Sequence, residues 1–164
     1  MATDTLLLAN LLSLIIVANG VPILAHAIFK HAGNRPLDGG LVLADGQPLF
    51  GPSKTVRGVI LSLLVTAVTA VVFALPWHIG AIIGAGAMLG DLISSFTKRR
   101  LRMASSSQAF GLDQIPESLL PLLLAKPWVD IAYIDIALLV VAFVVLELVL
   151  SRVVYRLRLG ERPY

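Results

Sequence analysis

Residues 79–102 read IGAIIGAGAMLGDLISSFTKRRLR, and this stretch says more about the chain than any other of its length. Its first part is apolar and glycine-rich, and its second part carries Asp91, three hydroxyls and a block of four cations. An acid at membrane depth costs roughly 2.5 to 3.5 kcal/mol on insertion scales. We therefore expect Asp91 to face a polar cavity or a cation rather than lipid.

The composition of the whole chain indicates a membrane protein. Hydrophobic residues make up 57% of the 164 residues and charged residues only 14%, and the mean hydropathy is +0.89. A soluble domain of this length is far less apolar. The chain has no cysteine, which excludes disulfides, thiolate catalysis and thiolate metal sites. We predict a single all-α, membrane-embedded domain over residues 1–164.

Five apolar segments are candidate membrane helices. Four have the length and composition of spans, whereas 115–128 is short and contains three prolines, so on length alone it also fits a re-entrant segment. The five segments are Leu6–Phe29, Val59–Leu75, Ile79–Thr97, Ile115–Trp128 and Ile131–Leu150.

The cations indicate the orientation. If the short segment crosses, twelve of the thirteen Lys and Arg residues lie on one side, which the positive-inside rule identifies as cytoplasmic. We predict five transmembrane helices with the N-terminus outside, the C-terminus cytoplasmic and two functional cytoplasmic loops. Because orientation also accounts for most of the basic pI of 9.6, no nucleic-acid partner is expected. The twelve are Lys30, Arg35, Lys54, Arg57, Lys98, Arg99, Arg100, Arg102, Arg152, Arg156, Arg158 and Arg162.

Small residues in the second and third segments predict close helix packing. Ser62, Thr66 and Thr69 share one helical face, and packing against a neighbouring helix is favoured over substrate contact for them. The pairs Gly80/Gly84 and Gly86/Gly90 lie on two different faces, where close approach of backbones explains them.

The end of the third segment carries a ladder of polar groups. If the helix continues through the basic block, Asp91, Ser95, Lys98 and Arg102 form one stripe from the membrane into the cytoplasm. Mg²⁺ prefers one or two carboxylates together with phosphate oxygens and water, and the cations add phosphate-binding groups. The ladder therefore predicts a polyphosphate site.

Both cytoplasmic loops add residues of the same kind. The segment FGPSKTVRG, residues 50–58, delivers Lys54, Thr55 and Arg57 to a helix N-terminus, where anions are favoured, although it is not a Walker loop. Asp113, in the loop after the third segment, lies at the same boundary as Asp91. It is as readily a helix N-cap as a ligand of a shared metal.

Together these elements resemble the CDP-archaeol synthase family. The resemblance rests on a GDxxxSxxKR pattern, on the LDQ that follows it, and on GPSKTVRG at residues 51–58, which is similar to the family's GKTWRG-type element. It covers nearly the whole chain, and a more distant likeness to phosphatidate cytidylyltransferase exists. The pattern residues are Gly90, Asp91, Ser95, Lys98, Arg99, Leu112, Asp113 and Gln114.

The resemblance implies transfer of CMP from CTP to a lipid phosphate, either 2,3-di-O-geranylgeranylglyceryl phosphate or a phosphatidate-like acceptor. The products would be a CDP-lipid and pyrophosphate, with Mg²⁺ as cofactor and an active site on the cytoplasmic side. The expected partners are CTP, the acceptor and membrane lipids, and a homo-oligomer is compatible with the sequence. The implied catalytic residues are Asp91, Asp113 and Lys98, the metal ligands Asp91 and Asp113, and the substrate-binding residues Lys54, Thr55, Arg57, Ser95 and Arg99.

The chain departs from the family pattern at one position. Family members often read DQxD, whereas here Pro116 stands in the place of the last acid and Glu117 follows it. Either Glu117 substitutes, or one metal position is lost, or the acceptor differs. Two other acids are weaker candidates for the site: Asp38 precedes glycine, as in a turn, and Glu147 is expected to pair with Arg152 or snorkel.

Two alternative functions remain open from the sequence. A CDP-alcohol phosphotransferase requires a DxxDGxxAR motif, which the chain lacks. A non-enzymatic membrane transporter or assembly subunit, with a cytoplasmic anion-binding site, predicts functional charges near mid-membrane. Here they cluster at the cytoplasmic boundary, which favours the enzyme.

Overall fold

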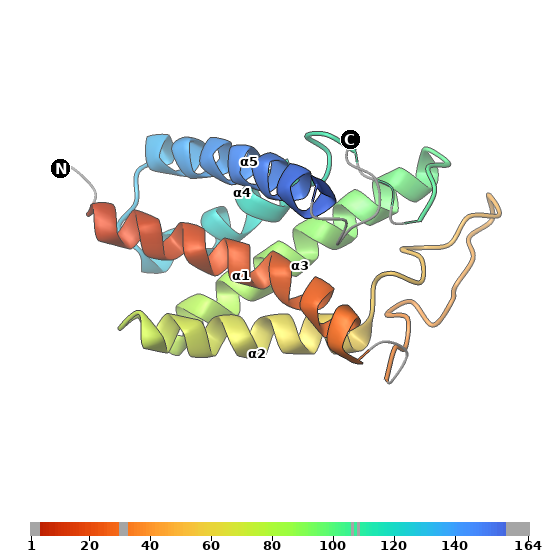
Figure 1. Ribbon diagram of the computed structural model, residues 1–164, viewed down its shortest axis with the longest axis horizontal. Coiled ribbons are helices and arrows are strands. Elements are labelled where there is room, and N and C mark those ends of the chain that lie inside the picture. Colours follow the sequence, from red (N-terminus) through yellow and green to blue (C-terminus); the bar gives the residue numbers. More distant parts are fainter. Residues whose placement is uncertain (1–3, 30–32, 106, 108, 157–164) are drawn as a thin grey trace.

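The computed structural model describes residues 4–29, 33–105, 107 and 109–156, with side chains described as far as residue 150. Within these residues the regular structure is helical, and two isolated β-bridges occur in the first loop. The prediction of an all-α fold is confirmed (Figure 1). The helices are α1 Thr5–Phe29, α2 Val56–Val72, α3 Trp77–Arg100, α4 Gln114–Ala125 and α5 Tyr133–Arg156, with a 3₁₀ turn, η1, at Lys126–Trp128. Of the cations used for orientation, Lys30, Arg158 and Arg162 lie outside the described residues.

Helix α3 lies at the centre and packs on two neighbours through its two glycine faces. A Cβ atom at Gly80 would collide with the backbone of α2 at Thr66, and one at Gly90 would collide with the backbone of α4 at Pro116. At Gly86 a Cβ atom would lie 2.5 Å from the Cα atom of Pro121. The two predicted packing faces are therefore confirmed, one against each neighbour.

The hydroxyl face of α2 is also used mainly for packing. Ser62 is fully buried and its Oγ donates to the carbonyl of Ala18 on α1 at 2.8 Å. Thr66 is fully buried as well, whereas Thr69 is half-buried and donates to a carbonyl of its own helix. Two of the three hydroxyls thus lie at helix contacts, as the sequence predicted.

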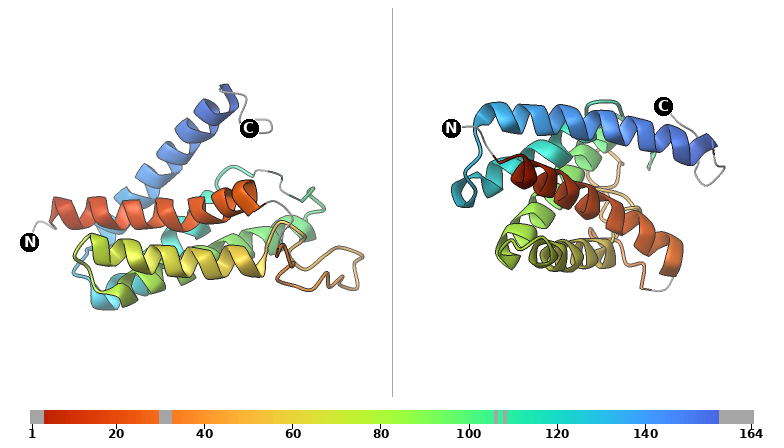
Figure 2. Two further views of the ribbon diagram at one scale, coloured as in Figure 1. Left: turned by 60° about the horizontal axis from the view of Figure 1, so that its bottom comes forward. Right: turned by 60° about the vertical axis from the view of Figure 1, so that its left-hand side comes forward.

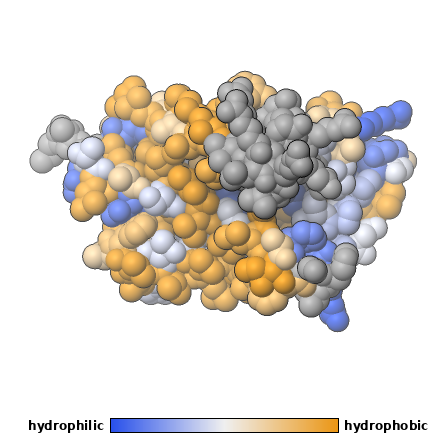
Figure 3. Space-filling view, in the orientation of Figure 1, coloured by the Kyte–Doolittle hydropathy of each residue, from blue (hydrophilic) through white to orange (hydrophobic). Residues whose placement is uncertain are grey.

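Apolar side chains form both the core and the outer surface. The core lies between α1, α3, α4 and α5, and large apolar side chains also cover the outside of the helices (Figure 3). This distribution is expected where lipid replaces water around the protein. The core includes Leu11, Leu14, Ile15, Ile79, Ile83, Leu122, Ile136 and Phe143.

Three of the helices have the length and composition of a membrane span. These are α1, α3 and residues 133–150 of α5, whereas α2 has 17 residues and α4 has 12. The five predicted helices are therefore present, and the crossing of the bilayer by α2 and α4 stays a prediction. Helix α5 runs obliquely to the others and its C-terminal part leans away from them (Figure 2).

Several helix ends differ from the predicted segments, and the differences at α2 and α3 bear on the candidate site. Helix α2 begins at Val56 rather than Val59, because Thr55 caps it by accepting the N–H of Gly58 at 3.1 Å, and it ends at Val72. Helix α3 ends at Arg100, and Arg102 has a left-handed backbone with φ of 58°. The predicted polar ladder therefore stops at Lys98 and does not include Arg102.

The two long loops gather at one end of the bundle. The α1–α2 loop and the α3–α4 loop both lie beside the C-terminal end of α3 (Figure 1). Hydrophilic residues are concentrated at this end (Figure 3). The candidate site residues are brought together here because α1, α2 and α3 run back and forth along the bundle.

Candidate functional site

The acid at the end of α3 is paired with a lysine from the first loop. The Nζ atom of Lys54 lies 2.5 Å from Oδ1 of Asp91, and both side chains are about four-fifths buried, each with 21% of its area exposed. Lys54 reaches Asp91 because the cap at Thr55 fixes the loop immediately before α2. The expectation that Asp91 faces a cation is met.

A second acid–lysine pair lies one to two turns further along α3. Lys98 Nζ is 2.7 Å from Oδ1 of Asp113 and also donates to the carbonyl of Ser107 at 2.7 Å. The other oxygen of Asp113 accepts the N–H of Ala109 at 2.9 Å. Asp113 stands at the N-cap position of α4 without capping it, so this carboxylate closes the α3–α4 loop onto α3 instead.

Glu117, in the first turn of α4, brings another carboxyl to Asp91. Its side chain is buried and lies within hydrogen-bonding reach of Asp91. The absence of a side chain at Gly90 is what lets the backbone of Pro116 and Glu117 press against α3. An acid therefore stands beside Asp91 even though Pro116 replaces the family's aspartate.

Glu147 on α5 approaches the site through Gln114. The buried amide of Gln114 accepts the N–H of Gly111 at 2.7 Å, and its Nε2 lies 3.5 Å from Oε1 of Glu147. The charge of Glu147 also interacts with Asp113 and Asp91. The sequence predicts that Glu147 pairs with Arg152 or snorkels; the side chain of Arg152 lies outside the described ones, so that pair stays a prediction. A lone acid within an apolar helix was the signal that deserved more weight.

Asp38 anchors the first loop. Its Oδ1 accepts the N–H of Gly40 at 2.9 Å, which is the predicted turn, and its Oδ2 accepts the N–H groups of Phe50 and Gly51 at 2.9 and 3.1 Å. Partial burial raises the pKa of Asp38, but these backbone donors outweigh that effect and hold the pKa below its ordinary value. Sequence reasoning missed this anchoring role, because the contacts with Phe50 and Gly51 span twelve and thirteen residues.

The two loops meet at Gly51. This residue has φ of 96°, and a Cβ atom there would lie 3.1 Å from Oγ of Ser105 and 3.5 Å from Nη1 of Arg99. Arg99 is buried and donates to the carbonyl of Ala104 at 2.6 Å. Arg100 adds a second connection, since it donates to Asp45 at 2.8 Å and to the carbonyl of Pro48 at 2.5 Å. Glycine at position 51 is needed for both its backbone angle and this close approach.

The structure thus sorts the predicted site residues into three groups. Asp91 with Lys54, and Asp113 with Lys98, form the two acid–lysine pairs, and Ser95 and Arg99 are buried on the same part of α3. Thr55 serves as the cap of α2. Arg57 turns to the other side, where its guanidinium lies 5.6 Å from the ring centroid of Phe29 on α1.

The chemistry of this arrangement suits polyanions more than a permanently bound metal. Within the described part of the chain, no three Asp, Glu or His side chains converge closely enough to hold a metal ion. Asp91 and Asp113 each have an ammonium partner. An ammonium group can also bind a phosphate oxygen, and charge-assisted contacts of this kind are among the stronger hydrogen bonds in proteins. The site can therefore neutralise several negative charges at the end of an apolar bundle.

Comparisons with known proteins point to one family and one fold. A family model described as CarS-like, CDP-archaeol synthase, matches residues 76–164. The CDP-archaeol synthase of Pyrobaculum aerophilum is 32% identical over 154 residues, which covers 90% of this chain and 92% of that protein. That of Thermococcus kodakarensis is 36% identical over 121 residues, covering 67% of each. A solved structure described as an intramembrane enzyme for archaeal membrane lipids biosynthesis has a TM-score of 0.75 and 29% identity, covering 90% of this chain and 94% of the other.

Proposed function

The chain belongs to the CDP-archaeol synthase family, and we propose that it transfers CMP from CTP to 2,3-di-O-geranylgeranylglyceryl phosphate, releasing pyrophosphate. Membership confirms the resemblance drawn from the motifs, and with it the prediction of a CTP-dependent nucleotidyltransferase in the membrane. It also supports formation of a CDP-lipid in archaeal lipid biosynthesis. The non-enzymatic transporter or assembly subunit is accordingly set aside.

One observation carries the proposal for the site. The pairs Lys54–Asp91 and Lys98–Asp113 stand where two loops close over the end of an apolar helix bundle. A nucleoside triphosphate arriving from water and a lipid phosphate arriving from the bilayer would meet at such a boundary. The buried lysines, with Arg99, supply positive charge where the phosphates of both substrates need it.

The reaction requires no nucleophile from the protein. An oxygen of the lipid phosphate attacks the α-phosphorus of CTP, a new P–O bond forms, and the bond from the α-phosphorus to the bridging oxygen breaks as pyrophosphate leaves. Lys98, Arg99 and Ser95 hold the triphosphate, and Lys54 neutralises charge beside Asp91. Catalysis then rests on positioning and on charge stabilisation.

Magnesium fits the residues present, with the triphosphate as part of its ligand set. Mg²⁺ is usually held by one or two carboxylates together with phosphate oxygens and water, and here Glu117 places a second carboxyl beside Asp91. We propose Asp91 and Asp113 as metal ligands, with Glu117 beside Asp91 in the role of the acid absent at Pro116. Because no three acids of the described residues converge on one point, phosphate oxygens of the bound CTP would complete the ligand set. When bound, the ion would neutralise the charge that develops on the phosphates.

The proposed orientation places this site in the cytoplasm. We propose that α2 and α4 complete five crossings, with the N-terminus outside and the C-terminus inside. The support is the clustering of cations in the two loops at one end of α3, combined with the positive-inside rule. CTP would then reach the site directly from the cytosol.

The test is a reconstituted assay in detergent. Purified protein is incubated with CTP, Mg²⁺ and either the ether-linked acceptor or a phosphatidate, and pyrophosphate and CDP-lipid are measured together. We expect equimolar products with the ether-linked acceptor, a rate reduced about 100-fold or more with Asp91→Asn, and near-normal activity with Asp130→Asn, which alters an exposed acid outside both loops. Folded wild-type protein that yields no CDP-lipid with any acceptor would refute the proposal.

A further inference from the structure

Helix α5 carries an acid on the face that packs against the bundle. Ile136, Leu139 and Phe143 are the buried side chains of this face. Glu147 follows four residues after Phe143 and so continues the same stripe, whereas Val145 points outward and is exposed. Ionisable side chains that membrane helices turn toward the bundle interior are costly to bury and generally serve function. Glu147 therefore calls for a role that an apolar residue cannot supply.

The acid reaches the start of α4 through an amide. Nε2 of Gln114, a fully buried side chain, lies 3.5 Å from Oε1 of Glu147. Oε1 of the same amide accepts the N–H of Gly111 at 2.7 Å. An ionised carboxylate can only accept a hydrogen bond and a backbone N–H can only donate one, so both contacts select the same orientation of the amide. Glu147 thus holds Gln114, and Gln114 holds Gly111.

Gly111 belongs to the turn that places the second acid–lysine pair. Its backbone has φ of 76°, and the turn closes where Oδ2 of Asp113 accepts the N–H of Ala109 at 2.9 Å. The other oxygen of Asp113 lies 2.7 Å from Nζ of Lys98. A displacement of the turn would therefore also displace the carboxylate that faces Lys98.

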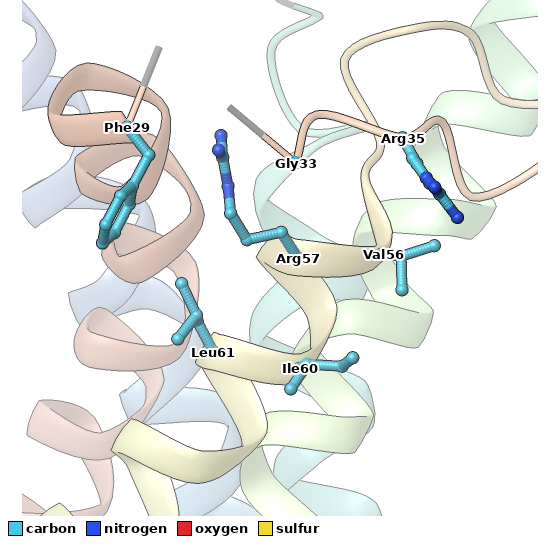
Figure 4. Close-up of a pocket in the computed structure, with 7 residues that line it drawn as sticks. All are labelled: Phe29, Gly33, Arg35, Val56, Arg57, Ile60 and Leu61. Atoms are coloured by element: carbon cyan, nitrogen blue, oxygen red, sulfur yellow. The ribbon is translucent and has the colours of Figure 1, made fainter. Parts of the chain in front are cut away.

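Helix α1 differs from α5 in this respect. It contains no Asp, Glu, Lys or Arg. At its end Phe29 packs against Arg57, beside a groove whose walls are almost entirely apolar (Figure 4). Of these two helices, α5 is thus the one that brings a charged side chain to the α3–α4 loop.

We propose that Glu147 is a positioning residue for the reaction and that, through Gln114, it holds the turn at Gly111. The turn in this place sets Asp113 and Lys98 for the triphosphate and its metal ion. The inference rests on the proposed function, which assigns the metal ion to Asp113 and the triphosphate to Lys98. Glu147 acts by accepting a hydrogen bond from the amide, not by contact with the substrates.

The kinetic test compares two substitutions of this acid. Glu147→Gln keeps an oxygen that can accept from Gln114, whereas Glu147→Leu keeps a similar size without any acceptor. We expect Glu147→Leu to lower kcat about tenfold, which corresponds to about 1.4 kcal/mol, and Glu147→Gln to recover most of that loss. The KM for the lipid phosphate should stay within about twofold in both. The matched control is Val145→Leu, on the exposed face of α5, which should keep wild-type kinetics.

Thermal unfolding of the same samples distinguishes positioning from a merely structural role. Leucine at position 147 continues the apolar stripe and removes a costly acid, so Glu147→Leu should keep or raise the unfolding temperature while kcat falls. A lower unfolding temperature together with a lower kcat would overturn the proposal, because the acid would then be structural. An equal loss of kcat in Glu147→Gln would overturn it too, since the charge rather than the hydrogen bond would matter. So would an unchanged kcat in Glu147→Leu.

Hydrogen exchange separates this proposal from the proposed function. Amide exchange of a peptide that contains Gly111 is measured by mass spectrometry without any substrate. We expect faster exchange in Glu147→Leu and in Gln114→Leu than in wild-type protein, and wild-type exchange in Glu147→Gln. Unchanged exchange in Glu147→Leu would show that the acid does not hold the turn. Failure of the proposed function would instead appear as the expected exchange pattern in a wild-type protein that forms no CDP-lipid.

Discussion

Lys54 and Asp91 form an ion pair with a separation of 2.5 Å, although they are 37 positions apart in the chain. The pair connects the first loop to the central helix, so it joins the two parts of the site that the sequence shows separately. The pair has two possible roles: it can hold the loop in place, or it can bind the substrates. An ion pair holds the loop whichever residue carries the positive charge, whereas binding of the substrates requires the positive charge at position 54 and the negative charge at position 91.

Exchanging the two charges separates these roles. We expect Lys54→Met and Asp91→Asn each to lower the unfolding temperature and to reduce the rate about 100-fold or more. The double exchange Lys54→Asp/Asp91→Lys should recover the unfolding temperature without recovering the rate, because the site then presents each charge at the wrong place for phosphate. Thermal unfolding and CDP-lipid formation are measured on the same samples. Recovery of activity by the exchange would show a purely structural pair.

Glu117 and Asp91 are expected to act as a unit. Glu117→Gln should reduce activity nearly as much as Asp91→Asn, and the double variant should be hardly worse than either, because contacting residues with one function are strongly non-additive. A double-mutant cycle on the rate constant measures this coupling, with the Mg²⁺ dependence of each variant as a second readout. Independent, multiplicative losses would exclude a shared role.

Gly90 should be intolerant of any side chain. Gly90→Ala introduces a Cβ atom that collides with the backbone of Pro116 and Glu117, and overpacking of this kind costs roughly 1 to 3 kcal/mol. Gly20→Ala is the matched control, since it lies within α1 and nothing stands within 4 Å of its Cβ position. We expect a lower unfolding temperature and lower activity for the first variant only. Equal effects of the two substitutions would argue against the close α3–α4 contact.

The lowered pKa of Asp38 predicts the pH below which the first loop loses its anchored conformation. In the folded protein the pKa of Asp38 is lowered from its ordinary value of 3.8. The ionised Asp38 therefore contributes its full stabilisation above pH 3.8, and this stabilisation is lost as the pH falls through the lower pKa of the folded state. Limited proteolysis of the loop should stay slow in wild-type protein down to about pH 4 and accelerate below it. Asp38→Asn should be cleaved rapidly even at neutral pH. Equal protection of both proteins at pH 7 would contradict the anchoring role.

The positions of the helices were largely predictable because they depend on consecutive residues. Apolar length and periodicity identified five helices, and glycine spacing identified both packing faces of α3. The errors were at ends that depend on single contacts. The cap at Thr55 starts α2 early, and the left-handed backbone at Arg102 removes that residue from the polar ladder.

The membership of the candidate site was predictable only in part. The residue types were correctly gathered at one end of α3, but which cation meets which acid was not readable from the spacing. Arg57 was grouped with Lys54, yet the two side chains point to opposite sides of the same helix terminus. The sequence indicated a turn at Asp38 and, for Glu147, a pair with Arg152 or snorkelling. It did not indicate their contacts in the structure, because those partners lie 12 to 33 residues away.

The sequence by itself determined that this protein lies in a lipid bilayer and that it is helical. It also contained the family motifs and indicated the end of the bundle where the charged residues collect. Hydropathy and helical period are properties of neighbouring residues, so no tertiary information was required. Only the tertiary structure decided that Glu117 stands beside Asp91 in place of an acid at Pro116, and that Arg57 lies against Phe29 of α1 rather than with the acid–lysine pairs. Both follow from how closely helices approach, and that distance is set by side chains on different segments of the chain.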